Sequence, residues 1–135
     1  MPDNGLSRLQ RRMKAVPEKI RRAVRPAVEK SADEMVDMAR RFAPVDDGTL
    51  RASIKHHAGP HDLSREVRAG GETTTRRVRA GADATYDYAL AQEYGSANHP
   101  AQPFFWPAYR LIRKRIKSRI RRAVGKAVRD FNDGK

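Results

Sequence analysis

Residues 107–131 read PAYRLIRKRIKSRIRRAVGKAVRDF, and this stretch predicts the clearest helix of the chain. Pro107 suits the first turn of a helix, where a missing N–H leaves no hydrogen bond unmade. At 1.5 Å per residue, a helix over these residues is about 37 Å long. It extends beyond a small core, so part of it is expected to contact a neighbouring subunit or something acidic. Its aliphatic residues recur every fourth position and form one face: Ile112, Ile116, Ile120, Val124 and Val128.

The charge of the chain is concentrated at its two ends. The 135 residues carry a formal net charge of +13. Residues 1–30 contribute +6, residues 107–135 contribute +9 and residues 31–106 contribute −2. This distribution indicates basic arms around a nearly neutral centre. The arginines of the last helix are candidates for contact with DNA phosphates or with an acidic neighbour, and the sequence leaves both partners open: Arg113, Arg115, Arg119 and Arg122.

Composition excludes several classes of protein. The chain has no Cys, so disulfides and thiolate metal sites are impossible. No apolar run approaches the length of a membrane span, and residues 1–12 lack the apolar region of a secretory signal. A chain of 135 residues is expected to form one domain with one modest core. Within it, we expect residues 1–25 to form a separate or flexible helical arm, residues 26–106 the motif-bearing core and residues 107–135 the basic C-terminal helix.

Helical spacing of apolar residues also runs through the first forty residues. Pro17 and Pro26 interrupt it, and each either kinks a continuous helix or begins a new one. We expect a helix over residues 26–43 and a less regular one before it. The helix must end at Pro44, because the residue before a proline is driven out of the helical region. Asp46, Asp47 and Gly48 then supply the chemistry of a turn.

The centre of the chain has the punctuation of short strands. Residues 51–58, 63–69 and 76–82 are of strand length and are separated by Gly-Pro and Gly-Gly pairs. Residues 85–94 instead repeat apolar residues at a spacing of four, which predicts a short helix ending at Gly95. Aromatic residues in and after this helix are expected to pack, the tyrosines between the short helix and the sheet and the others as anchors of the last helix: Tyr86, Tyr88, Tyr94, Phe104, Phe105 and Trp106.

No set of residues predicts catalysis. His57 and His61 are four apart, but Gly59 and Pro60 between them prevent a helical metal-binding pair. The Asp46–Asp47 pair is better explained by a turn than by the metal-binding acids of a nuclease. The phosphate-binding, zinc-protease and nucleophile motifs are also missing. The sequence therefore predicts no catalytic, metal-binding or cofactor-binding residues, and no enzyme.

Three segments in order resemble the signature of small tail-completion proteins of long-tailed phages, a family of the virion neck and of head–tail joining genes. Residues 43–54, APVDDGTLRASI, resemble A-P-v-d-t-G-x-L-r-x-S-I. Residues 86–96, YDYALAQEYGS, are similar to Y-A-x-x-x-E-[FY]-G-[ST]. Residues 101–108, AQPFFWPA, resemble a-x-P-F-l-x-P-A. The departures are Asp47 in place of Thr and Trp106 in place of a polar residue.

This resemblance implies an α+β fold, with a small antiparallel sheet of about three to four strands flanked by a long N-terminal helix, a short middle helix and the long basic helix. It implies a structural virion protein, made in the bacterial cytoplasm, that forms a ring in the neck, sixfold by the symmetry of the tail. The ring would join the DNA-filled head to the tail. Its implied partners are its own copies, the stopper, tail terminator and tail tube, and packaged double-stranded DNA, with no membrane.

Two other functions compete with this one. The net charge of +13 is also typical of a nucleoid-type protein that binds DNA without regard to sequence. A small phage nuclease or protease accessory is the third hypothesis, with Asp46 and Asp47 as its test residues. Neither hypothesis accounts for three ordered motifs between two long helices.

Overall fold

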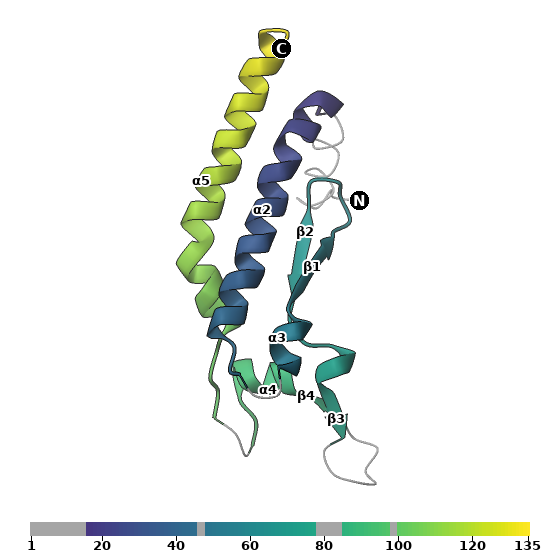
Figure 1. Ribbon diagram of the computed structural model, residues 1–135, viewed down its shortest axis with the longest axis vertical. Helices are drawn as coiled ribbons and strands as arrows, with labels where there is room; N and C mark the ends of the chain where they lie inside the picture. The colour runs from purple at the N-terminus through teal and green to yellow at the C-terminus, as the bar shows by residue number, and fades with distance from the viewer. Residues whose placement is uncertain (1–15, 46–47, 78–84, 98–99) are drawn as a thin grey trace, which may run out of the picture.

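The computed structural model describes residues 16–45, 48–77, 85–97 and 100–135. Its frame is a pair of long antiparallel helices, α2 (Glu18–Phe42) and α5 (Phe105–Asn132), which pack along each other (Figure 1). The smaller elements lie against one flank of α2 and around its C-terminal end. The last turns of α5 reach past the first described turn of α2. Among the described residues, no helix is long and apolar enough to cross a lipid bilayer.

Helix α2 begins earlier than the proline pattern predicts. It starts directly after Pro17, whose carbonyl accepts hydrogen bonds from the N–H groups of Ile20 and Arg21 at 3.0 and 3.1 Å. It then runs through Pro26 without a break, because Pro26 is exposed and water can solvate the carbonyl that the proline cannot bond. The C-terminal end is as expected: Ala43 is extended, with ψ 139°, ahead of Pro44.

The fold is α+β, but the expected single sheet is wrong. In the described part of the chain, four short strands form two separate antiparallel pairs, β1 with β2 and β3 with β4. Gly70 and Gly71 follow β2 with φ of +90° and +119°, so the chain turns away before β3 can extend the first pair. The strands are β1 (Lys55–Ala58), β2 (Arg65–Arg68), β3 (Thr75–Arg77) and β4 (Thr85–Asp87), with a 3-10 turn, η1 (Glu72–Thr74), before β3.

Two boundaries differ from the predicted elements for local reasons. Residues 51–53, expected in a strand, belong to the short helix α3 (Thr49–Ser53), which starts after Gly48 with φ +85°. That helical turn places Leu50 in the core. Residues 85–87, expected in a helix, form β4, and α4 (Tyr88–Tyr94) starts only where Asp87 caps it. Residues 78–82 of the third predicted strand lie outside the described residues.

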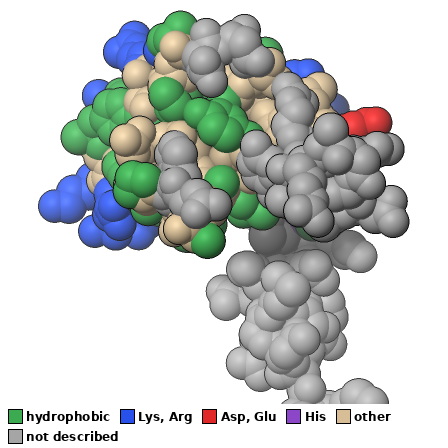
Figure 2. Space-filling view, turned by 90° about the horizontal axis from the view of Figure 1, so that it is seen from below, with side chains coloured by type: hydrophobic (Ala, Val, Ile, Leu, Met, Phe, Trp, Pro, Cys, Tyr) green, Lys and Arg blue, Asp and Glu red, His purple; other side chains and the backbone are tan. Residues whose placement is uncertain are grey.

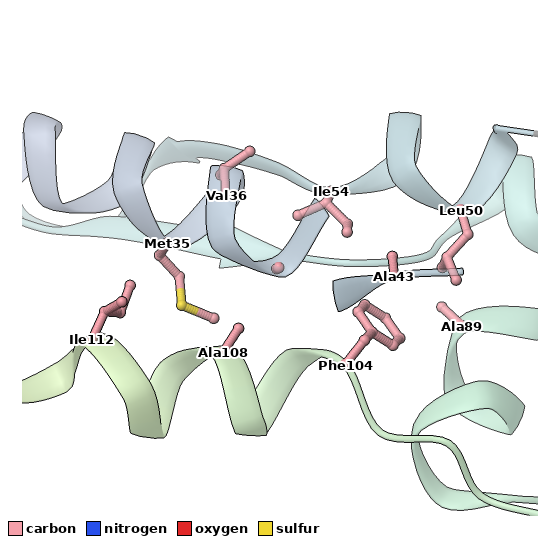
Figure 3. Close-up of a cluster of buried hydrophobic side chains, with 10 residues drawn as sticks. Met35, Val36, Ala43, Leu50, Ile54, Ala89, Phe104, Ala108 and Ile112 are labelled. Carbon is pink, nitrogen blue, oxygen red and sulfur yellow. The ribbon is translucent and has the colours of Figure 1, made fainter. Parts of the chain in front are cut away.

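The hydrophobic core lies where α2 ends and α5 begins. Ala39, Ile54 and Ala108 are completely buried there, and Phe104 is 1% exposed. Side chains from α2, α3, α4 and α5 meet around Phe104 (Figure 3). Four elements therefore share one small core: Met35, Val36, Ala39, Ala43, Leu50, Ile54, Ala89, Phe104, Ala108 and Ile112.

Farther along the helix pair, ion pairs between Glu34 and two arginines join α2 to α5. Glu34 accepts hydrogen bonds from Arg115 at 3.0 Å and from Arg119 at 3.1 Å, and Arg119 also donates to the hydroxyl of Ser31 at 3.1 Å. Partial burial of Glu34 opposes its ionisation, but the hydrogen bonds and positive charge of the two arginines outweigh this effect and lower the pKa of Glu34 below its ordinary value. The ionised carboxylate therefore stabilises the helix pair.

This ion pair predicts a dependence of stability on pH. Because the folded-state pKa of Glu34 is lowered, its stabilisation is full above the ordinary value of 4.5 and is lost as the pH falls through the folded-state pKa. The side chain is 22% exposed, so we expect Glu34→Gln to destabilise by about 1 kcal/mol at pH 7. Urea denaturation at neutral pH and near pH 3 checks this. A difference between the two proteins that persists undiminished in acid would contradict it.

Candidate assembly surface

The three motifs, far apart in the sequence, meet at the core end of the helix pair. The first contributes Leu50 and Ile54 to the core, the second Ala89 and the third Phe104 and Ala108. Their polar residues form hydrogen bonds that hold the motifs together. The motifs therefore build one compact end of the molecule, which we call the motif end: residues 43–45, 48–54, 87–97 and 100–108, as far as the structure describes them.

The buried carboxylate of Glu93 joins the second motif to the third. It is 6% exposed and accepts three backbone hydrogen bonds, from the N–H groups of Phe104 at 2.8 Å, Phe105 at 2.9 Å and Trp106 at 3.0 Å. These N–H groups begin α5, where Phe104 at the N-cap has no side-chain acceptor of its own. A negative charge at this end is also favoured by the helix dipole. Glu93 thus acts as the missing cap of α5.

Gln92 also connects α4 to the segment that leads into α5. Its side-chain amide donates to the backbone carbonyl and to the side-chain oxygen of Gln102, both at 3.1 Å, and its own carbonyl accepts from the N–H of Gln102 at 2.8 Å. Gln92 is 2% exposed. The two consecutive polar residues that α4 buries therefore both bind the segment leading into α5, which fixes the angle between the helices.

Asp87 ties the start of α4 to the turn after β2. Its carboxylate accepts from the N–H of Ala89 at 2.8 Å, from the Thr74 hydroxyl at 2.6 Å and from the N–H of Gly71 at 3.0 Å. The neighbouring Gly70 approaches so closely that an added Cβ would lie 2.8 Å from both Ala89 Cβ and the Asp87 carboxylate. Gly70 is thus required for its φ of +90° and for the close approach.

The first motif closes the C-terminal end of α2. Both Nε and Nη2 of Arg51 donate to the carbonyl of Ala43 at 3.3 Å, and Arg40 donates to the carbonyl of Ile54 at 2.7 Å. Ser53 donates to the carbonyl of Leu50 and accepts from the N–H of Gly70 at 2.9 Å. The two arginines also place positive charge where the helix dipole favours it. Arg51 and Ser53, two polar residues of this motif, therefore serve internal contacts.

The outer side of the motif end carries apolar side chains. Leu90 and Tyr94 of α4 are 60% and 65% exposed, and Trp106 and Tyr109 of α5 are 46% and 38% exposed. We call these four residues the aromatic face. The Trp106 indole N–H donates to the Tyr94 hydroxyl at 2.8 Å, which ties its two helices together. Figure 2, which looks onto this end of the molecule, shows hydrophobic side chains gathered there with Lys and Arg at the margin.

Aromatic rings connect this face to the core, and two hollows flank them. Phe105 lies edge-to-face with Phe104 at 6.4 Å and with Trp106 at 5.2 Å between ring centroids. One hollow, of about 350 Å³, lies between α4 and the end of β2. The other, of about 320 Å³, lies over α2 between β2 and α5, and is lined mainly by apolar side chains such as Met35, Val67 and Ile116. Exposed apolar side chains gathered in one place are typical of surfaces that associate with other proteins.

The predicted packing residues divide into two groups. Phe104 is in the core, and Tyr88 and Phe105 are half-buried against it. Tyr94 does not pack between the short helix and the sheet as expected, because the side of α4 that carries Leu90 and Tyr94 faces outward, whereas Ala89, Gln92 and Glu93 face inward. Trp106 contacts Phe105 and Tyr109 but stays half-exposed. The side chain of Tyr86 lies outside what the structure describes.

The predicted turn residues lie where the chain changes direction. Gly48 has φ +85° and Gly95 has φ +83°, both in the region that glycine adopts at low cost. Gly95 ends α4, and its N–H donates to the carbonyl of Ala91 at 2.7 Å. Pro44 follows the end of α2. Asp46 and Asp47, which were also the candidate nuclease acids, lie outside the described residues.

The predicted partner-binding arginines do not form one surface. Arg115 and Arg119 both bind Glu34 of α2; the Arg119 side chain is 15% exposed, whereas that of Arg115 stays 58% exposed. Arg113 is exposed, and Arg122 donates to Ser118 at 3.3 Å. Sequence spacing alone could not show that α5 turns Arg115 and Arg119 toward α2. Glu93 was missed too, although a helix beginning at Phe104 with no Ser, Thr, Asp or Asn cap signals that a cap must come from elsewhere.

Comparison with known families supports the same segments. A family model described as "Bacteriophage HK97-gp10, putative tail-component" matches residues 7–95, well over half of the chain. The chain belongs to the HK97-gp10-like family. This confirms the family resemblance carried by the first two motifs. No curated protein and no solved structure matches the chain.

Membership of the HK97-gp10-like family makes the chain a phage tail component, hence a virion protein that contacts other tail or neck proteins. The matched region ends at Gly95, before the third motif and α5. The cap from Glu93 to Phe104, Phe105 and Trp106 crosses this limit. The family region of the chain therefore determines how the basic helix beyond it is held.

Proposed function

We propose that this tail component is a structural subunit of the phage neck, that its copies assemble in a ring, sixfold by the symmetry of the tail, and that the ring joins the DNA-filled head to the tail. The stopper, tail terminator and tail tube are its neighbours in this proposal, and it performs no catalysis. The proposal places it at the tail end of the virion after synthesis in the bacterial cytoplasm. The observation that carries it is the aromatic face at the motif end of the molecule.

The geometry of the aromatic face supports a role in assembly. Its four side chains come from two helices whose relative position is fixed by the Glu93 cap and the Gln92 contacts. A rigid, partly exposed apolar surface loses little conformational entropy on association and gains free energy by burial. The face also lies at one end of an elongated molecule. Contact between such an end and a different part of the next copy forms a ring where the rotation from copy to copy closes.

A nucleoid-type protein is the weaker candidate. Its main support was the charge of the last helix, and two of the arginines expected to bind DNA instead bind Glu34. Family membership also favours a virion component. DNA contact is then a property of a tail subunit and need not be its whole function.

A substitution on the aromatic face tests the proposal in the phage that carries this chain. Leu90→Glu places a charge on a 60% exposed side chain, so the fold should tolerate it while association should not. We expect unjoined heads and tails in electron micrographs and a drop in infectious particles of about 100-fold or more, since a desolvated charge costs several kcal/mol. Density for the chain in purified wild-type particles gives its position and symmetry.

Leu111→Glu is the matched control. Leu111 is 63% exposed on α5 and lies outside both hollows, so this variant should assemble normally. Joined, infectious particles containing Leu90→Glu would overturn the proposed interface. Absence of the wild-type chain from purified virions would overturn the proposed function itself.

A further inference from the structure

The side of α5 turned away from α2 carries an unbroken row of positive side chains. With 3.6 residues per turn, positions 110, 114, 117 and 121 fall on one stripe, and position 113 lies beside it. This stripe is opposite the side on which Ile112 is buried and Arg119 binds Glu34. All five of its side chains are exposed: Arg110, Arg113, Lys114, Lys117 and Arg121. We call them the outer stripe.

The outer stripe has no acidic partner in the described parts of the chain. Ion pairs on α5 involve Arg115, Arg119 and Lys126, which lie on other sides of the helix. By contrast, the exposed side of α2 mixes its cations with Glu29, Asp33 and Asp37. Five cations along one side of a straight helix, without acidic partners among the described residues, produce a local positive potential.

The dimensions of the outer stripe fit a nucleic-acid strand. From position 110 to 121 the helix rises about 16 Å. One strand of B-form DNA carries a phosphate for about every 3.4 Å of axis, so the same length holds about five phosphates. Five cations therefore face a comparable number of negative charges. The support is rigid, because Glu93 caps the start of α5 and α2 packs against its length.

The composition of the outer stripe favours a polyanion over a protein surface. Protein interfaces are enriched in aromatic residues, Met and Arg and depleted in Lys. The outer stripe contains two Lys and three Arg and no apolar side chain. The apolar anchors of the molecule lie instead on the aromatic face.

We infer that the outer stripe of α5 binds the phosphates of double-stranded DNA, independently of base sequence. The inference goes beyond the proposed neck role, because it concerns the free chain and does not depend on where the chain sits in the particle. It also replaces two of the residues expected from sequence, since Arg115 and Arg119 are already ion-paired with Glu34 of α2.

Fluorescence anisotropy with a labelled duplex of about 40 base pairs, over a series of salt concentrations, tests the inference. The test variant is Lys114→Gln, Lys117→Gln and Arg121→Gln together. If each cation meets one phosphate, the slope of log K against log salt should become shallower by about 2.7, and affinity at about 50 mM salt should fall by at least about 100-fold. Circular dichroism should show an unchanged fold, because these side chains have no partners within the described chain.

The matched control combines Lys19→Gln, Lys30→Gln and Arg41→Gln. It removes the same number of positive charges, two Lys and one Arg, from exposed positions on α2. It should retain the wild-type slope. Equal losses in both variants, or wild-type binding by the outer-stripe variant, would overturn the inference. So would an outer-stripe variant that loses binding to polyglutamate but keeps binding to the duplex, because the stripe would then serve an acidic protein. Failure here leaves the particle assay with Leu90→Glu unaffected, since the two assays probe different surfaces.

Discussion

Glu93→Ala is expected to lower the free energy of unfolding by about 3–4 kcal/mol, because three backbone N–H groups at the start of α5 lose a charged acceptor in a buried setting. The loss combines unpaired donors with the removal of a negative charge from a helix N-terminus. Urea denaturation followed by circular dichroism measures it. Since α5 is the partner of α2, the whole transition should shift as one.

Two companions make this experiment specific. Glu93→Gln keeps one acceptor oxygen but places an amide donor against backbone donors, so its loss should lie between wild type and Glu93→Ala. Glu29→Ala removes an exposed glutamate from α2 and should change stability by no more than about 0.5 kcal/mol. A Glu93→Ala protein as stable as wild type would mean that water caps α5 just as well, and would contradict the stabilising role of Glu93.

Phe104→Ala is the second large effect, expected at about 3–5 kcal/mol. The ring is 1% exposed and is surrounded by residues of all three motifs, so its removal leaves a cavity that four elements cannot close together. Thermal and urea unfolding both measure this change. Because small domains are stable by only about 5–15 kcal/mol, part of the population should already be unfolded at physiological temperature.

Phe131→Ala is the control for Phe104→Ala. Phe131 is 42% exposed near the end of α5, far along the helix from the core. It should lose about 1 kcal/mol or less. Similar losses at both positions would show that the described core is not the part of the chain that limits stability.

Periodicity predicted the two long helices and the end of α2 at Pro44. The aliphatic ladder of α5 is buried only near the core: Ile112 is 1% exposed, whereas Val124 and Val128 are 40% and 38% exposed. The run through Pro26 could not be predicted, because it depends on that proline facing water. The outward-facing Leu90 and Tyr94 reverse the usual rule, since α4 buries Gln92 and Glu93 to hold its neighbour.

The candidate site was predictable only in part, for a related reason. The motifs gave the right segments, but not their contacts, because the partners of Glu93 are main-chain groups 11 to 13 residues away. The partners of Glu34 are more than 80 residues away. Contacts of this kind carry no local pattern. Only the folded chain shows which arginines of α5 face inward and which form the outer stripe.

The Glu93 carboxylate binds backbone N–H groups, and every residue type except proline supplies one. Position 106 can therefore exchange its side chain and keep its hydrogen bond to Glu93, although the contact of the Trp106 indole with Tyr94 is then lost. In the proposed assembly, the parts that set the geometry of the molecule are separate from those that contact a neighbour. A virus whose structural components change together could revise the outer side chains one at a time, each revision tested on an unaltered scaffold.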